Sequence, residues 1–295
     1  SRSLDNSRGQ ISSNGALALN AGALVNTGGI ISAQHDITAQ TTSIDNSQGK
    51  LLAQNALTLN STGDVINSAG QIGANEAVQF SSSSLRNDQQ GHITSGNGTL
   101  AISTGALNNQ TGSISARQDT HISSLQLVNA GGQISAGTIT IDTHQQSLSH
   151  ALGRIASTAG RVDIQSGTLN NQGGVIQSSA ALSVATGGQS LNNAQQGLIA
   201  SLGKTTLMTG QLDNSSGRIQ AGGTQAATAT TPEQTVLSDI SINATGAVKN
   251  MDGLVQASRD IGIAAQSLDN TRGSMLAGNA LTVQSADAVK NSGWF

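Results

Sequence analysis

The chain has no cysteine, a single proline and almost no aromatic residues, and each shortage narrows the possible structures. Without cysteine, neither a disulfide framework nor a thiolate metal site can form. Aromatic residues make up 1% of the 295 residues, so a wide core filled by bulky rings is excluded. Only 10% of residues are charged, and the net charge of −3 gives no reason to expect nucleic acid as a partner.

Long apolar segments are also missing. No apolar run approaches the roughly 18 residues that a membrane-spanning helix needs, so we expect no membrane insertion. The first residues lack the charged and then apolar pattern of a signal peptide. Both ends fall within a repeat, and we therefore expect the sequence to be a segment of a longer chain.

Glycine, small polar residues and aliphatic residues dominate instead, and they recur at a regular spacing. A unit of an aliphatic residue, a variable residue and Asn returns at intervals of about 20–22 residues, with one longer interval between Asn214 and Asn250. Gly follows most of these Asn residues after three positions, and an aliphatic residue or Met lies two positions beyond that Gly. The fourteen marker residues are Asn6, Asn26, Asn46, Asn67, Asn87, Asn109, Asn129, His150, Asn171, Asn193, Asn214, Asn250, Asn270 and Asn291.

The pattern within one repeat predicts three short strands. Apolar and polar residues alternate in three segments, as in strands that bury one face. Gly at a corner supplies either a positive φ or a close backbone approach. A coil of about 20 residues cannot bury its apolar face alone, so coils must stack with their strands paired in parallel. The sequence therefore predicts an all-β parallel β-helix, a solenoid of about 14 coils of about 20–22 residues, over a single domain of residues 1–295.

Stacking also predicts a role for the marker residues. Equivalent residues of successive coils lie in columns about 4.8 Å apart. We expect the fourteen markers to form a structural ladder inside a corner, in which each amide bonds to the next coil and satisfies buried backbone groups. His150 takes one ladder position, where we expect it to replace the hydrogen bonds of Asn rather than bind a metal.

One repeat is interrupted by an insertion at about residues 220–238. Ile219 and Ile240 are the equivalents of Ile11 and Leu17, but the segment between them is more than three times as long. Insertions in solenoids form loops on one face. A surface loop without a role of its own is one interpretation, and a contact loop at 222–234 is the other. The candidate contact residues are Thr228, Thr230, Thr231, Pro232 and Glu233.

The repeated pattern, Leu-x-Asn-x-x-Gly-x-Ile-x-Ala-x-x-x-Leu-x-Leu, resembles the haemagglutinin repeats of filamentous haemagglutinin and of contact-dependent growth-inhibition exoproteins. Residues 43–53, SIDNSQGKLLA, are a representative copy, and the resemblance covers essentially the whole chain. It implies a right-handed coil within a long secreted filament that displays an adhesive tip or delivers a toxin. It also implies two-partner secretion through an outer-membrane transporter to the surface of a Gram-negative bacterium, with a part in virulence.

An enzyme is the main functional alternative, because some β-helices degrade polysaccharides. Such a site needs carboxylates that converge from neighbouring coils. The candidates are Asp5, Asp45, Asp213 and Asp269, each one residue before a ladder position. They should point outward, and the closest two are two coils apart, roughly 10 Å. No histidine has the spacing of a metal motif, so we expect no enzyme, no cofactor and no metal.

A leucine-rich repeat is the alternative fold, since it also carries an Asn ladder and repeats every ~20–29 residues. It would need one strand per repeat, whereas here a Gly corner and two further apolar segments follow each Asn. The leading functional hypothesis is a structural stalk or spacer of a surface adhesin or toxin-delivery filament. The alternative is an adhesive module that contacts a host or target-cell glycan, or a receptor protein, through a polar sheet face or the 222–234 loop.

Overall fold

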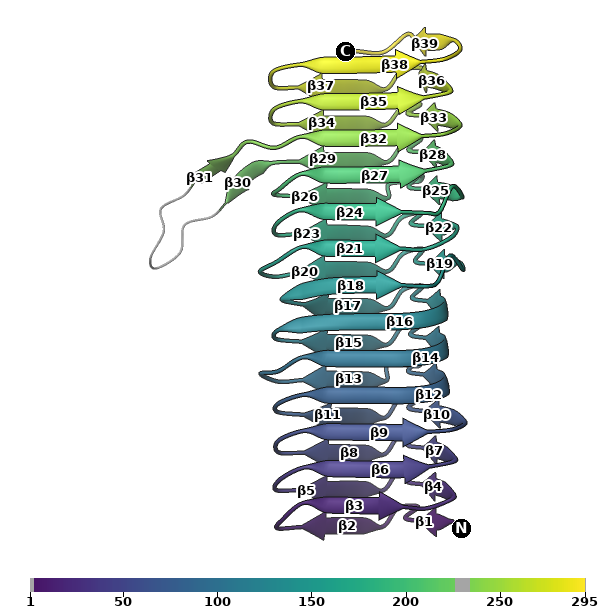
Figure 1. The fold of residues 1–295 in the computed structure, drawn as a ribbon, viewed down its shortest axis with the longest axis vertical. Coiled ribbons are helices and arrows are strands. Elements are labelled where there is room, and N and C mark those ends of the chain that lie inside the picture. The colour runs from purple at the N-terminus through teal and green to yellow at the C-terminus, as the bar shows by residue number, and fades with distance from the viewer. Residues whose placement is uncertain (1–2, 226–233, 295) are drawn as a thin grey trace. The chain divides into compact units, whose positions relative to one another are not determined.

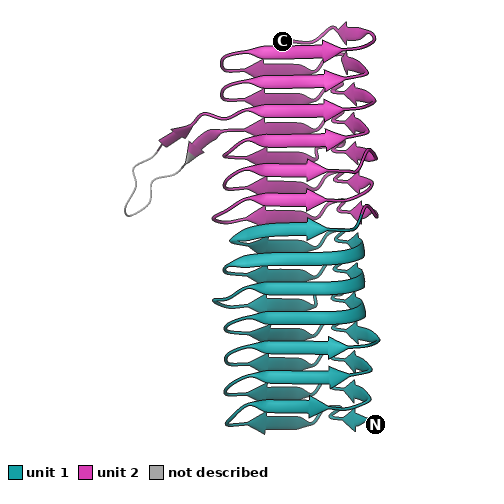
Figure 2. Cartoon of the chain, viewed as in Figure 1, with its two compact units in different colours: residues 1–144 teal, residues 145–295 magenta. Residues whose placement is uncertain are grey.

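The computed structural model describes residues 3–225 and 234–294, and all of its regular elements are β-strands (Figure 1). None of these residues lies in a helix, so the described part of the chain has no apolar helix that could cross a membrane. The chain divides into two compact units, residues 1–144 and 145–295 (Figure 2). Each unit is a stack of coils whose strands pair in parallel, so the predicted parallel β-helix is confirmed.

Three strand positions recur along each unit. A marker strand precedes the ladder residue, a second strand follows the Gly corner, and a third strand completes the coil. In unit 1 the marker strands are β1 (Leu4–Asp5), β4 (Ala23–Val25), β7 (Ser43–Asp45) and β10 (Asp64–Ile66). Its second strands are β2 (Gln10–Ser13), β5 (Ile30–Ala33), β8 (Lys50–Ala53), β11 (Gln71–Ala74), β13 (His92–Ser95), β15 (Ser113–Ala116) and β17 (Gln133–Ala136). Its separate third strands are β3 (Leu17–Asn20), β6 (Ile37–Thr41), β9 (Leu57–Ser61) and β18 (Thr138–Asp142).

Three coils of unit 1 differ from the predicted three short strands, because the third strand runs directly into the next marker strand. The merged strands are β12 (Val78–Arg86), β14 (Leu100–Asn108) and β16 (Asp119–Val128). Residues at the expected third corner stay in the parallel ladder, as Ser82 opposite Thr104 shows. The backbone there keeps its hydrogen bonds to the neighbouring coil, so no separate corner forms.

Unit 2 repeats the same plan. Its marker strands are β19 (Leu148–Ser149), β22 (Leu169–Asn170), β25 (Ser190–Asn192), β28 (Gln211–Asp213), β33 (Ala247–Lys249), β36 (Ser267–Asn270) and β39 (Val289–Asn291). The second strands are β20 (Arg154–Ser157), β23 (Val175–Ser178), β26 (Leu198–Ser201), β29 (Arg218–Ala221), β34 (Leu254–Ala257) and β37 (Ser274–Ala277). The third strands are β21 (Val162–Gln165), β24 (Leu182–Ala185), β27 (Thr205–Thr209), β32 (Ile240–Ala244), β35 (Ile261–Ala265) and β38 (Leu281–Ser285). A hairpin of β30 (Gly223–Gln225) and β31 (Gln234–Val236) projects from these coils (Figure 1).

The core of each unit is a set of aliphatic columns. On the second strands of unit 1, Ile31 pairs in register with Leu51, which pairs with Ile72, and all three are buried. Phe80 is the only aromatic side chain in the described core. Each coil covers the apolar face of the next, which is why a coil of this length folds only within a stack. Three strand positions per coil also show that the leucine-rich-repeat alternative was wrong.

The corner glycines are required by close packing and not by an unusual φ. Gly29 has an ordinary φ, and the positive φ of this corner belongs to Gly28 at 63°. A Cβ on Gly29 would overlap the Asn6 carbonyl of the previous coil and lie 2.6 Å from the Asn26 Oδ1. In most other coils the residue before the glycine takes the left-handed conformation without being glycine, as Gln48 does at 56°. Of the two reasons considered for this glycine, the close backbone approach is therefore the one that applies.

Candidate functional site

The ladder residues from Asn6 to Asn270 lie buried in a corner of their coils and hydrogen-bond along the stack, whereas Asn291 is exposed. From Asn6 to Asn129 in unit 1, each Nδ2 donates to the Oδ1 of the next Asn at 2.6–2.8 Å. From Asn171 to Asn291 in unit 2, the same bonds measure 2.7–2.9 Å. The Nδ2 of Asn26 also donates to the carbonyls of Gly29 at 3.3 Å and of Lys50 at 3.0 Å. One amide thus joins its own corner to the neighbouring coil.

His150 occupies its ladder position with a different set of bonds. Its side chain is fully buried, and its Nε2 donates to the Val175 carbonyl at 3.1 Å. Burial lowers the pKa of His150 from its ordinary 6.5 to about 4, while the bond to Val175 acts in the opposite direction. The imidazole is therefore neutral at pH 7. The Oδ1 of Asn171, in the next coil, has no hydrogen-bond partner among the described residues.

The four candidate carboxylates are not brought together. Asp5 and Asp45 each accept a hydrogen bond from the backbone N–H two residues later, at 2.8 and 2.9 Å. Val25 lies between them in register, so they are two coils apart as predicted. Asp213 and Asp269 make the same local bond, at 2.9 and 3.0 Å. These side chains cap a turn, which accounts for them without catalysis.

In the last four coils of unit 2, the column one residue before the ladder alternates in charge. Asp213 pairs in register with Lys249, Lys249 with Asp269, and Asp269 with Lys290. The Lys290 Nζ lies 3.6 Å from the Asp269 Oδ2. Hydrogen bonds from the Thr271 side chain and backbone are the main reason why the pKa of Asp269 lies below its ordinary value, and Lys290 adds to this. Opposite charges across neighbouring strands contribute to stacking rather than to a reactive centre.

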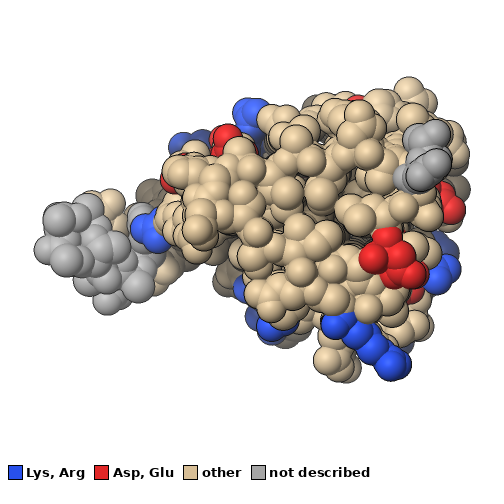
Figure 3. Space-filling view, turned by 90° about the horizontal axis from the view of Figure 1, so that it is seen from below, with Lys and Arg blue, Asp and Glu red and all other residues tan. Residues whose placement is uncertain are grey.

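Charge is otherwise sparse. In Figure 3 the Lys, Arg, Asp and Glu side chains form small groups separated by uncharged surface. Within residues 3–225 and 234–294, no three His, Asp or Glu side chains are grouped so that they could hold a metal ion. The described surface therefore offers hydrogen-bonding side chains far more often than charges.

The insertion is the longest departure from the repeat in the described part of unit 2. Its two strands pair antiparallel, with Gly223 opposite Val236 and Thr224 opposite Thr235. The candidate contact residues Thr228, Thr230, Thr231, Pro232 and Glu233 lie outside the described residues. The described strands show that the insertion leaves and re-enters the coil as a paired hairpin.

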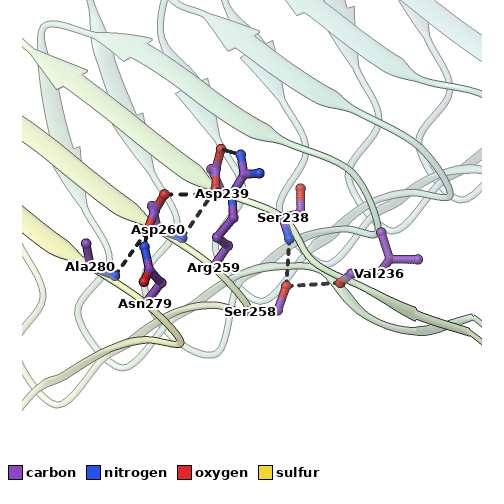
Figure 4. A network of polar contacts seen from close by, with 8 residues as sticks. All are labelled: Val236, Ser238, Asp239, Ser258, Arg259, Asp260, Asn279 and Ala280. Atoms are coloured by element: carbon purple, nitrogen blue, oxygen red, sulfur yellow. Dashed lines mark hydrogen bonds and ion pairs between the residues drawn. The ribbon is translucent and has the colours of Figure 1, made fainter.

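The root of the hairpin is tied to the next coil (Figure 4). The Ser258 hydroxyl donates to the Val236 carbonyl at 3.0 Å and accepts from the Ser238 N–H at 2.7 Å. Gly222, with a φ of 80°, packs against the same hydroxyl so closely that any Cβ there would overlap it. Ser258 therefore hydrogen-bonds the returning end of the hairpin and lies in close contact with its departing end.

A charged network holds the returning chain beside this root (Figure 4). Arg259 forms a bidentate pair with Asp239, its Nε donating to Oδ1 at 2.6 Å and its second nitrogen contacting Oδ2. This guanidinium is the main reason why the pKa of Asp239 lies below its ordinary value. In the next coil, Asp260 accepts from the Asn279 amide at 2.7 Å and from the Ala280 N–H at 3.1 Å. The network spans three successive coils.

A groove of about 310 Å³ lies beside the hairpin root. Its lining includes Gln177, Gln220 and Gln256 from three second strands, together with Ala200, Gly222 and Gly223. None of the described lining residues is charged. Sequence reasoning located the insertion but missed this groove, because its residues come from four coils and only the strand register brings them together.

Stacked parallel coils, an internal amide ladder and turn-capping carboxylates define the class of structural, adhesin-type β-solenoids. The chain belongs to the haemagglutinin-repeat family: the haemagglutinin-repeat model matches residues 1–40, 36–110, 93–151, 134–193, 184–250 and 252–293. The family predicted from the repeated pattern is thus confirmed, and two-partner secretion and adhesin character follow from it. Neither the curated proteins nor the solved structures contain a significant match to the chain.

Proposed function

We propose that residues 1–295, as a single β-helical domain, form a structural stalk or spacer of a secreted filament on the surface of a Gram-negative bacterium. The full-length protein would leave the cell through an outer-membrane transporter of the two-partner type and serve as an adhesin or a toxin-delivery filament. Family membership supports the secreted, adhesin-type setting. This chain would add length to the filament and would have no catalytic role.

The observation that supports a spacer most directly is the repetition of the same bonds in each coil. Every ladder Asn of unit 1 from Asn6 to Asn109 donates to the next one, and the aliphatic columns run in register beside them. Each coil therefore contacts only its neighbours, and each adds the same rise of about 4.8 Å. A filament built in this way changes its length by whole coils without a change in its core.

Removing whole coils tests this proposal. Deletion of residues 27–87 removes three coils of unit 1 and joins Asn26 to Asp88, at equivalent positions of the repeat. Because the chain has no cysteine, Ser12→Cys and Ser135→Cys provide two unique sites for spin labels on the second strands. We expect pulsed electron paramagnetic resonance to show a label distance shorter by about 14 Å, three times the rise of one coil.

The control is deletion of residues 223–237, which removes the hairpin but no coil. It leaves Gly222, Ser238 and Asp239 between Ala221 and Ile240, matching the three residues that separate Ser201 from Thr205. We expect no change in the label distance. A coil-deletion chain that loses its β-structure, or keeps the original distance, contradicts the spacer proposal.

The tied hairpin supports a second candidate, an adhesive module that contacts a glycan or a receptor protein. Ser258, Gly222 and the Arg259–Asp239 pair fix the root of the hairpin. A fixed root favours a binding role over a passive surface loop. We expect the 223–237 deletion to keep the circular dichroism of the parent chain and to lose binding to target cells. Binding that survives with intact folding would remove the hairpin from adhesion.

A further inference from the structure

The groove beside the hairpin owes its shape to the strand register. Gln177 on β23 pairs with Ala200 on β26, Ala200 with Gln220 on β29, and Gln220 with Gln256 on β34. These four positions form one outward-facing column. Ala200 places a single methyl group between two long amides, so the column is hollowed at that point. Gln177 and Gln220 lie two strands apart, about 10 Å.

Two neighbouring contacts orient the amides of the column. The Arg154 guanidinium donates to the Gln177 Oε1 at 3.2 Å, and the Gln220 Nε2 donates to the Gln256 Oε1 at 3.3 Å. The Nε2 of Gln177 is thereby left to donate, and the Oε1 of Gln220 to accept. A ligand across Ala200 would meet a donor at one end and an acceptor at the other.

The hairpin root forms the wall of the groove. Gly222 and Gly223 line it with backbone and no side chain; Gly223 pairs with Val236, whose carbonyl accepts a hydrogen bond from Ser258. Backbone at a wall lets a ligand approach closely and offers peptide groups for hydrogen bonding. The volume of about 310 Å³ is at the lower end of the usual range for ligand sites.

The chemistry of the lining decides between classes of ligand. None of the described lining residues is charged, and the nearby Arg154 guanidinium already donates to the Gln177 Oε1, so a charged ligand would lose hydration without gaining an ion pair from the lining. A peptide could not extend the floor as a new strand, since β26 and β29 are each paired on both edges. Hydroxyl groups both donate and accept hydrogen bonds, so they match the glutamine amides. Because the Gln177 donor and the Gln220 acceptor lie about 10 Å apart, the ligand must be extended.

We infer that this groove binds an uncharged oligosaccharide, which lies across Ala200 between Gln177 and Gln220 and against the Gly222–Gly223 backbone. The inference rests on the second proposed function and names the ligand class of that site. It assigns the contact surface to the sheet face and the hairpin root.

Ala200→Gln tests the site. The new side chain would fill the hollow, and the neighbouring positions of the same outward column already carry glutamine. The matched control is Ala185→Gln, at an equally half-buried outward position on β24, outside the groove lining. The probes are immobilised oligomers of glucose, galactose, mannose and N-acetylglucosamine, beside sialylated and sulfated glycans and a library of extended peptides. We expect the parent chain and Ala185→Gln to bind an uncharged oligomer, and Ala200→Gln to bind it roughly tenfold more weakly or not at all.

The inference is overturned if the parent chain binds no uncharged oligomer, if it retains only charged glycans or peptides, or if Ala200→Gln binds as the parent does. Comparison with the 223–237 deletion on target cells separates this result from the adhesive proposal. Cell binding that is lost in the deletion and kept in Ala200→Gln would reject the groove while the hairpin stays an adhesive element. Cell binding kept in both chains would exclude both the hairpin and the groove as the contact surface, and a parent chain that does not bind cells would reject the adhesive module itself.

Discussion

Each ladder asparagine makes bonds that no aliphatic side chain of similar size can replace. Asn109 accepts from Asn87 at 2.7 Å and donates to Asn129 at 2.6 Å and to the Gln133 carbonyl at 3.2 Å. The three amide side chains are buried, so a lost partner leaves them without water to replace it. The amide therefore stabilises three coils at once.

Asn109→Leu should lower the free energy of unfolding by about 1–3 kcal/mol, because it leaves a donor and carbonyl groups without partners. Urea titration followed by circular dichroism measures this change. The control is Arg117→Ala, since Arg117 is exposed and its substitution should be nearly silent. Equal stability of the two variants would show that the amide column does not stabilise the stack.

His150 makes the stability of unit 2 depend on pH. Its folded pKa of about 4 lies below the ordinary 6.5, so the unfolded chain binds more protons between these values. Stability should be highest above pH 6.5 and fall as the pH is lowered to 4, by up to about 3 kcal/mol. Urea midpoints at several pH values measure the loss.

His150→Asn provides the comparison. The new amide would resemble the other ladder positions and donate to the Asn171 Oδ1, adding about 1 kcal/mol at neutral pH. It should also remove most of the loss between pH 6.5 and 4. If the variant loses as much stability in acid as the parent chain, His150 is not the titrating group.

At the scale of a single element, the corner before each second strand needs glycine, because a side chain there would overlap the neighbouring coil. Gly29→Ala would drive a methyl group into the Asn6 carbonyl of the neighbouring coil, and backbone there cannot move without breaking the ladder. We expect a loss of about 1–3 kcal/mol or more in the free energy of unfolding. Thermal or urea unfolding of the purified variant measures it.

Gly15→Ala is the matched control in the same unit. A Cβ on Gly15 would meet no atom within 4 Å, and its φ is ordinary. This substitution should leave stability unchanged or raise it slightly, by restricting the unfolded chain. Similar losses in the two variants would show that the cost comes from flexibility rather than from the close approach at the corner.

At the scale of the whole molecule, stability should follow the number of coils. Deleting residues 27–87 removes about one fifth of the chain, so the urea m-value should fall by a similar fraction, in proportion to the surface that unfolding exposes. The 223–237 deletion removes only a projecting hairpin and should change the m-value much less. A coil deletion that leaves the m-value unchanged would mean that the removed coils were not part of the cooperative structure.

Repetition explains how much could be predicted from the sequence. A single Leu-x-Asn unit carries little information, but its return at intervals of about 20–22 residues determines strand direction, parallel pairing and the column of marker residues. The handedness of the coil stays a prediction from the family resemblance. The merged strands β12, β14 and β16 could not be predicted, because their serine-rich links are compatible with both a corner and an extended strand.

The sequence by itself determined the family, the parallel coils, and the position of His150 and of the insertion, since each depends on spacing along the chain. Only the tertiary structure decided why the corner glycine is needed, how Ser258 ties the hairpin, and that Gln177, Ala200 and Gln220 form one hollowed column. The reason is physical: these properties depend on atoms of different coils, which the strand register brings within a few ångströms of one another.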